Sequence, residues 1–178
     1  LDSNYVSTYY PWIKIRDTEN NKFIFLPPTK DVIANAAYTD KNLYPWYAPA
    51  GLSRGQVDCI RARKSLKKNE EDILYNGRIN MVKTFSAEGV IIWGQKTLQV
   101  KDTALTRINV RRLLIRMKKI ISNACLSLIF QPNDDTTKQQ FFNIVTPILN
   151  DIRSGRGISD YKIIVDDSEE AREQLRFP

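Results

Sequence analysis

Residues 79–93 read Ile-Asn-Met-Val-Lys-Thr-Phe-Ser-Ala-Glu-Gly-Val-Ile-Ile-Trp, and this stretch decides the fold of the 178-residue chain. The runs 79–85 and 89–93 are short, apolar and rich in β-branched side chains, which is typical of strands. Gly89 and Gly94 punctuate the runs, and a third candidate strand follows at 96–100. The centre of the chain is therefore predicted to be a β-sheet.

The residues before this centre predict a hairpin, a helix and a long loop. Two apolar runs, 12–16 and 22–26, flank a turn-rich Asp-Thr-Glu-Asn-Asn segment, so they form a β-hairpin. Pro27-Pro28 stops the second strand, and Thr29 caps a short helix that runs to about Tyr38. Residues 39–56 are a loop held by aromatic side chains, and 57–75 are partly helical.

The residues after the centre predict two helices and two short strands. Apolar side chains from Val110 to Ala124 recur every three or four positions, which indicates a helix capped by Thr106 or Asn109. A strand at 126–130 precedes a second helix, which Asn133 caps, Pro147 kinks, and the glycines at 155 and 157 end. A last strand covers 161–165. The sum is an α+β fold, an α/β sandwich in which a mixed sheet packs with helices in one domain, 1–178.

The residue types argue against an active site. The chain has no histidine, which excludes Ser/His and Cys/His nucleophile pairs and histidine-bearing zinc sites. Helix capping explains the pair Asp134-Asp135, and Asp166-Asp167 lacks companion carboxylates at calcium-loop spacing. Cys59 and Cys125 lie far apart without metal spacing, so reduced thiols are favoured over a disulfide. We therefore expect no catalytic, metal-binding or cofactor-binding residues.

Positive charge is concentrated in the middle third. Residues 61–119 carry fifteen basic and five acidic side chains, whereas residues 1–60 are neutral and residues 120–178 carry three net negative charges. Such a layout favours head-to-tail contact between copies as much as it favours nucleic acid. The charge separates into two sets. The first basic set is Arg61, Arg63, Lys64, Lys67 and Lys68; the second basic set, which follows Arg107, is Arg111, Arg112, Arg116, Lys118 and Lys119.

Each basic set has two readings that the sequence leaves open. One is a docking face for an acidic partner or a phosphate backbone, and the other is a solvated face without a partner. Like charges on neighbouring helical turns, as at Arg112 and Arg116, repel each other unless a partner neutralises them, which favours a partner. On the docking reading, charge reversal at Arg111, Arg112 and Arg116 weakens assembly and leaves the fold intact.

Several local patterns occur in an order that resembles one family. They are Tyr-Pro-Trp-Ile-Lys at 10–14, Pro-Pro at 27–28, Ala-Pro-Ala-Gly-Leu-Ser-Arg-Gly-Gln at 48–56, Gly-Val-Ile-Ile-Trp-Gly-Gln-Lys-Thr-Leu at 89–98, Ile-Asn-Val-Arg-Arg-Leu at 108–113 and Phe-Gln-Pro-Asn-Asp at 130–134. In this order they resemble the C-terminal domain of phage-type contractile tail sheath proteins. The resemblance covers roughly residues 9–166. Asn35 and Tyr38 depart from it, standing where that family often has glycine and arginine.

The resemblance implies a mechanical function. The chain would be the tube-proximal C-terminal domain of a longer sheath protein, which polymerises around a tail tube and contracts to drive the tube through the host envelope. Its partners would be other copies, the tail tube, the baseplate and the tail terminator. It would be found in the virion, and in the host cytoplasm during assembly. The resemblance implies no enzyme activity and no membrane or nucleic-acid partner.

The resemblance also implies that chain segments pass between neighbouring copies as added β-strands. The last predicted strand is the candidate edge for such strand augmentation, and it comprises Tyr161, Lys162, Ile163, Ile164 and Val165. The runner-up function, a basic nucleic-acid-binding α/β module, depends only on the surplus charge at 61–119.

Overall fold

The computed structural model describes residues 1–165 and divides the chain into two compact units, Leu1–Arg116 and Met117–Pro178. The Asp166-Asp167 pair therefore lies outside the described residues. Helix α3 (Ile108–Ala124) begins in the first unit and ends in the second. No helix among the described residues has both the length and the hydropathy needed to cross a membrane.

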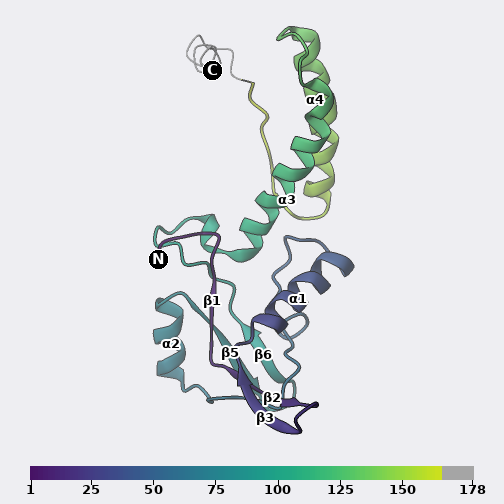
Figure 1. Ribbon diagram of the computed structural model, residues 1–178. Coiled ribbons are helices and arrows are strands. Elements are labelled where there is room, and N and C mark those ends of the chain that lie inside the picture. The colour runs from purple at the N-terminus through teal and green to yellow at the C-terminus, as the bar shows by residue number, and fades with distance from the viewer. Residues whose placement is uncertain (166–178) are drawn as a thin grey trace. The chain divides into compact units, whose positions relative to one another are not determined.

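The first sheet contains the two strands predicted at the centre of the sequence. Its order is β1 (Thr8–Tyr10), β5 (Ile79–Phe85) and β6 (Gly89–Trp93), as Figure 1 shows. Strands β5 and β6 are antiparallel, with Val82 opposite Ile92, and β1 pairs parallel to β5. The sheet is therefore mixed, as predicted, although the sequence did not reveal its parallel edge strand β1.

The second sheet is built on the predicted hairpin. Strands β2 (Ile13–Asp17) and β3 (Lys22–Leu26) pair antiparallel, and β4 (Arg61–Ala62) pairs with the other edge of β2. Asp17 fixes the turn because its Oδ1 accepts the backbone N–H of Glu19 at 3.1 Å. The sheet order β3-β2-β4 leaves β3 at an edge.

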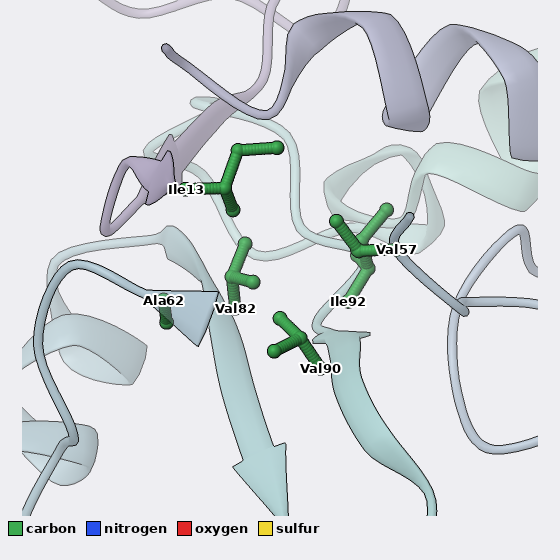
Figure 2. Packing of buried hydrophobic residues seen from close by; sticks show 6 residues of the cluster. All are labelled: Ile13, Val57, Ala62, Val82, Val90 and Ile92. Atoms are coloured by element: carbon green, nitrogen blue, oxygen red, sulfur yellow. The ribbon is translucent and has the colours of Figure 1, made fainter. Parts of the chain in front are cut away.

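The core of the first unit lies where the two sheets meet. Its central side chains come from β2, β4, β5, β6 and the loop before β4, and they point toward one another in Figure 2. They are almost fully shielded from water, with Val82 at 0% and Ile92 at 1% exposure. Burial of these apolar side chains is the main favourable term for folding. The cluster consists of Ile13, Val57, Ala62, Val82, Val90 and Ile92.

Two helices flank the sheets of the first unit, and α1 has a different N-cap from the Thr29 predicted. Helix α1 (Thr29–Asn42) has Pro28 at its N-cap position and runs four residues beyond Tyr38. The extension is stabilised at Thr39, whose buried hydroxyl donates to the carbonyl of Asn35 at 2.7 Å. Helix α2 (Lys68–Asn76) begins where Oε2 of Glu70 accepts the backbone N–H of Lys67 at 3.0 Å.

Three predicted strands are wrong in the isolated chain. Residues 96–100 make only a single bridge, between Lys96 and Arg107, because other backbone N–H groups donate elsewhere: Thr97 to Thr106, and Leu98 and Val100 to the irregular segment before β1. Residues 125–128 form a 3-10 turn, η2 (Cys125–Leu128), since a short apolar run after a helix does not distinguish a strand from a turn. Residues 161–165 pair with no strand among the described residues.

The second unit is organised by α4 (Asp135–Ser154), which contains Pro147 and ends at Gly155 as predicted. Its N-cap is Asp134 rather than Asn133, because the Asp134 carboxylate accepts the backbone N–H of Thr137 at 2.8 Å. This bond lowers the pKa of the Asp134 carboxyl. The buried stripe of the helix is Val145, Leu149 and Ile152.

The core predicts a strong dependence of stability on Ile92. Ile92→Ala should lower the free energy of unfolding by about 2–5 kcal/mol, because a cavity remains between the sheets. Ile33, which is 64% exposed on α1, provides the control, since Ile33→Ala should change it by less than about 0.5 kcal/mol. Urea denaturation followed by circular dichroism measures both, and equal effects would contradict the packing described.

Candidate assembly surfaces

The second basic set does not form one docking face, because the Arg112 side chain is bonded to other segments of the first unit. Its guanidinium pairs with the Asp40 carboxylate and donates to the carbonyl of Ala36 at 3.0 Å and of Tyr47 at 3.5 Å. The Arg112 side chain is only 17% exposed. The predicted like-charge repulsion with Arg116 is therefore relieved within the chain, by Asp40 and the last turns of α1.

Arg111 holds the N-terminal segment in a similar way. Its Nε donates to Oδ1 of Asn4 at 3.0 Å, and its guanidinium lies 3.9 Å from the centre of the Tyr5 ring. On the same helix, Asn109 donates to the carbonyl of Trp46 at 3.2 Å. The motif Asn-Val-Arg-Arg-Leu thus joins three distant segments to the start of α3, and Leu113 completes it as a buried side chain.

The exposed members of the second basic set are Arg116, Lys118 and Lys119. They stay candidates for contact with an acidic partner. The expectation that reversal of Arg111, Arg112 and Arg116 leaves the fold intact is corrected by these contacts, because two of the three side chains hold the fold together. The periodicity of a helix shows which positions share a face, but it does not show which distant segment covers them.

The first basic set is divided between paired and exposed side chains. Nζ of Lys64 lies 2.6 Å from the Glu70 carboxylate, and Nζ of Lys68 lies 3.3 Å from that of Asp72. The bond from Lys64 is the first cause of the lowered pKa of the Glu70 carboxyl. The Arg63 guanidinium lies 5.3 Å from the centre of the Phe25 ring. Arg61 and Lys67 are exposed.

The Trp-Gly-x-x-Thr motif works as a clamp around the buried side chain of Asn80. Asn80 donates to the carbonyl of Lys96 at 2.8 Å and accepts the backbone N–H of Lys96 at 2.6 Å. A Cβ at position 94 would lie 2.8 Å from Oδ1 of Asn80, so only glycine fits there. The Thr97 hydroxyl then donates to the carbonyl of Leu105 at 2.9 Å.

The Ala-Pro-Ala-Gly loop packs against the free edge of β6. Gly51 has a φ of +87° and donates its N–H to the carbonyl of Ile92 at 2.9 Å, while Gly55 accepts the N–H of Ile92 at 2.7 Å. A Cβ at Gly55 would lie 2.7 Å from the carbonyl oxygen of Ile92. The N–H groups of both glycines are therefore bonded within the protein, so this loop is a rigid turn and does not present its amides to a phosphate.

Strand β3 offers an open edge that sequence reasoning missed. Its side chains are mostly exposed, including Phe23 at 59% and Leu26 at 40%. Among the described residues, the only strand that pairs with β3 is β2. Apolar exposed edge strands are templates for pairing with another chain. The sequence does carry a signal for this edge. The run Lys-Phe-Ile-Phe-Leu is more apolar than a strand with one solvated face normally is, which indicates that a partner covers it.

The candidate augmentation segment lies extended beside α4. The Tyr161 hydroxyl donates to Oδ1 of Asn150 at 2.8 Å, and it lies 3.5 Å from the carbonyl of Thr146. Beyond this anchor, Ile164 is 72% exposed. The segment therefore presents backbone groups and β-branched side chains without a partner strand in the described chain.

Neither cysteine is placed for chemistry in the described region. Cys59 and Cys125 are free thiols, and no three His, Cys, Asp or Glu side chains between residues 1 and 165 could hold a metal ion. Burial, followed by the charges of Asp31 and Asp58, raises the pKa of the Cys59 thiol from 9.0 to about 11. Because the thiolate is the reactive form, Cys59 is a poor nucleophile at neutral pH.

Solved structures show that this is the fold of contractile sheath assemblies. A chain of an extracellular contractile injection system, the PVC sheath complex in its contracted state, superposes with a TM-score of 0.82 and 24% identity. The match covers 98% of this chain and 50% of that one. The contracted helical sheath of the anti-feeding prophage gives a TM-score of 0.78 and 23% identity, with 96% and 50% covered. The α+β fold class is thereby confirmed.

Curated sequences identify the relationship. The tail sheath protein of Vibrio phage KVP40 is 33% identical over 94% of this chain, and that of Salmonella phage ViI is 29% identical over 93%. The tail sheath protein of Enterobacteria phage T4 is 28% identical over 84%. The chain is thus homologous to phage tail sheath proteins, and the resemblance predicted from the ordered motifs is confirmed.

The chain spans only part of these relatives. It covers 24% of the Vibrio phage protein, 26% of the Salmonella phage protein and 23% of the Enterobacteria phage protein. No family model matches the chain. The relatives are structural proteins, and tail sheath proteins are components of the virion.

Arg112 and Arg116 should respond differently to truncation. Arg112→Ala should lower the free energy of unfolding by about 1–3 kcal/mol, because three bonded acceptors lose their donor. Arg116→Ala should change it by less than about 0.5 kcal/mol, since Arg116 is exposed. Thermal and urea denaturation of both variants provide the measurement. A stable Arg112→Ala protein would contradict an internal role for this side chain.

Cys59 should react slowly while the chain is folded. At pH 8, a pKa of about 11 in place of 9.0 reduces the thiolate fraction about 100-fold. Reaction with a chromogenic disulfide should slow about tenfold, because a thiolate of higher pKa is more nucleophilic and offsets part of this loss. The Cys125→Ser background isolates Cys59, and the same protein in urea is the control. Equal rates in the folded and unfolded states would show that the thiol is not shielded.

Proposed function

We propose that the chain is the C-terminal, tube-proximal domain of a contractile tail sheath subunit. The subunit polymerises with its own copies around a tail tube and contracts to drive the tube through the host envelope. Homology to a tail sheath protein over 94% of the chain is the observation that carries this proposal. The role is structural and involves no catalysis. The protein works in the virion tail after assembly in the host cytoplasm.

Neighbouring subunits are joined by an added strand. Residues 161–165 are extended and unpaired, and β3 lies at the edge of its sheet with exposed apolar side chains. We infer that the segment from one copy leaves its anchor on Asn150 and pairs with β3 of another. Backbone bonds give such a link its strength while the connecting chain can still act as a hinge.

The exposed basic side chains provide the reversible contacts. Arg61, Lys67, Arg116, Lys118 and Lys119 are exposed. Exposed ion pairs contribute about 0–1 kcal/mol each, which suits a surface that templates assembly on an acidic tube and then releases it. The baseplate and the tail terminator are the further partners at the two ends of the polymer. Which basic side chains face the tube depends on the assembled geometry.

The nucleic-acid alternative has less support than the charge of residues 61–119 suggested. Arg111 and Arg112 are held by Asn4 and Asp40, and Lys64 and Lys68 are paired with carboxylates on α2. These four side chains are engaged within the chain, which reduces the charge available to contact a phosphate backbone. Tight binding of DNA that weakens steeply with salt would favour this alternative.

Polymerisation tests the proposal. Full-length protein that carries this domain should form tubes or rings visible by negative-stain electron microscopy. Ile163→Pro should abolish the tubes, because proline removes a backbone donor from the added strand. Ile163→Thr, which keeps the N–H and the β-branched shape, is the matched control and should assemble. A protein that stays monomeric at high concentration would contradict the proposed function.

A further inference from the structure

A hollow lies on the face of the first sheet opposite the main core. It is bounded by α2, by the end of β6 and by the loop at Ala48–Gly51, and its volume is about 440 Å³. Met81 and Ile79 lie along it, while Trp93 and Tyr75 are 42% and 55% exposed. Sites that hold a bound group commonly enclose about 300–1,000 Å³ behind mostly apolar walls. The hollow is therefore large enough for one or two apolar side chains.

The rim of the hollow is positively charged. The carboxylates of Glu71 and Asp72 are neutralised, because Nζ of Lys83 lies 2.6 Å from the first and Nζ of Lys68 lies 3.3 Å from the second. Two further cations remain. Nζ of Lys96 lies 3.2 Å from the centre of the Tyr75 ring, and Arg107 is exposed. An occupant that combines apolar side chains with a carboxylate would match this surface.

The second unit carries a group with this chemistry at the turn between α3 and α4. Leu126, Ile129 and Phe130 are 60%, 53% and 101% exposed. We call these three residues the apolar knob. Asp135 follows at the start of α4, and its carboxylate is fully exposed, 3.6 Å from Nζ of Lys138. The knob matches the apolar walls of the hollow. The Asp135 carboxylate is paired with Lys138, as Asp72 is with Lys68, but its full exposure leaves it open to a second cation at the rim.

Phe130 is unusual in backbone as well as in exposure. Its φ is +68°, in the left-handed region that bulky side chains rarely adopt. Its side chain is fully exposed, so packing within the described residues does not offset this strain. Strained residues of this kind cluster at functional sites, such as ligand clamps and switch regions. The Phe130 ring is therefore accessible to a partner.

From these observations we propose that the apolar knob of one copy docks in the hollow of another copy, with Phe130 against Trp93 and Met81 and with Asp135 facing Arg107. The inference rests on the proposed function, because it requires copies to assemble. The two surfaces are different parts of the chain, so the contact is heterologous. A contact of this type links copies head to tail, into a ring where the rotation closes and into an open helical polymer where it does not.

Substitution of Phe130 tests the knob in full-length protein. Phe130→Asp should reduce sedimentable polymer at least about tenfold, because central aromatic anchors dominate interfaces. Phe130→Leu should keep most of it. Ile33→Asp, at a 64% exposed apolar position on α1, is the matched control and should assemble as the unmodified protein does. Normal assembly of Phe130→Asp would overturn the inference and leave the proposed function standing, whereas an unmodified protein that never polymerises would sink both.

Charge exchange tests the partner surface. Arg107→Glu and Asp135→Lys should each weaken assembly, and the double variant should regain most of it, because the pair is restored with reversed sign. Additive losses in the double variant would overturn the pairing of these two residues. Circular dichroism should be unchanged in all three variants, since both side chains are exposed.

Cross-linking decides which copy holds the knob. Both native cysteines are first replaced, by Cys59→Ser and Cys125→Ser. Copies that carry Phe130→Cys are then mixed with mass-tagged copies that carry Tyr75→Cys, and the mixture is oxidised. A mixed disulfide dimer is expected, whereas Ile33→Cys in place of Tyr75→Cys should give none. A dilute double variant that closes only within one chain would show that the knob fills its own hollow, and this result would overturn the inference.

Discussion

The side chain of Asn80 connects the centre of the first sheet to everything that follows it in the chain. It bonds both backbone groups of Lys96 from a buried position on β5, and this is possible because Gly94 leaves room for it. The segment after Lys96 can then turn through Thr97 and deliver the start of α3 to the sheet, where Ile108 donates its N–H to the carbonyl of Gln95. The first turns of α3 in turn hold the N-terminal segment and the end of α1. The Asn80 amide is therefore a direct link between the first sheet and the segment that leads into α3.

The sequence predicted those helices and strands whose stabilising contacts lie between residues close together in the chain. The β2–β3 hairpin, the β5–β6 pair and helices α3 and α4 were visible because turn residues and apolar periodicity lie within each element. Strand β1 was not visible, since its pairing with β5 joins residues about seventy positions apart in the chain. The same limit explains Arg111 and Arg112. Their spacing indicated a basic helix face. The residues that hold them, Asn4 for Arg111 and Asp40 for Arg112, lie far away in the sequence.

The candidate surfaces divide in a similar way. The apolar run of β3 carried a signal of its open edge, whereas the hollow beside α2 appears only when the sheet and the helix are assembled. The ordered motifs contributed more than their individual chemistry. Three of the motifs form hydrogen bonds that join distant segments of the fold: Trp-Gly-x-x-Thr, Ala-Pro-Ala-Gly and Asn-Val-Arg-Arg-Leu. This explains how they can mark a fold without forming an active site.

The parallel pairing of β1 with β5 has a mechanical consequence. Thr8, Tyr9 and Tyr10 are opposite Ile79, Asn80 and Met81, and the segment before them is tied to the Val100 region by Asp2. A force along the strand axis, applied to the residues before Thr8, strains all three pairs at once in shear. The same bonds pulled from one end of an antiparallel hairpin would open one after another. The first unit is thus built to transmit tension along this strand rather than to unzip under it.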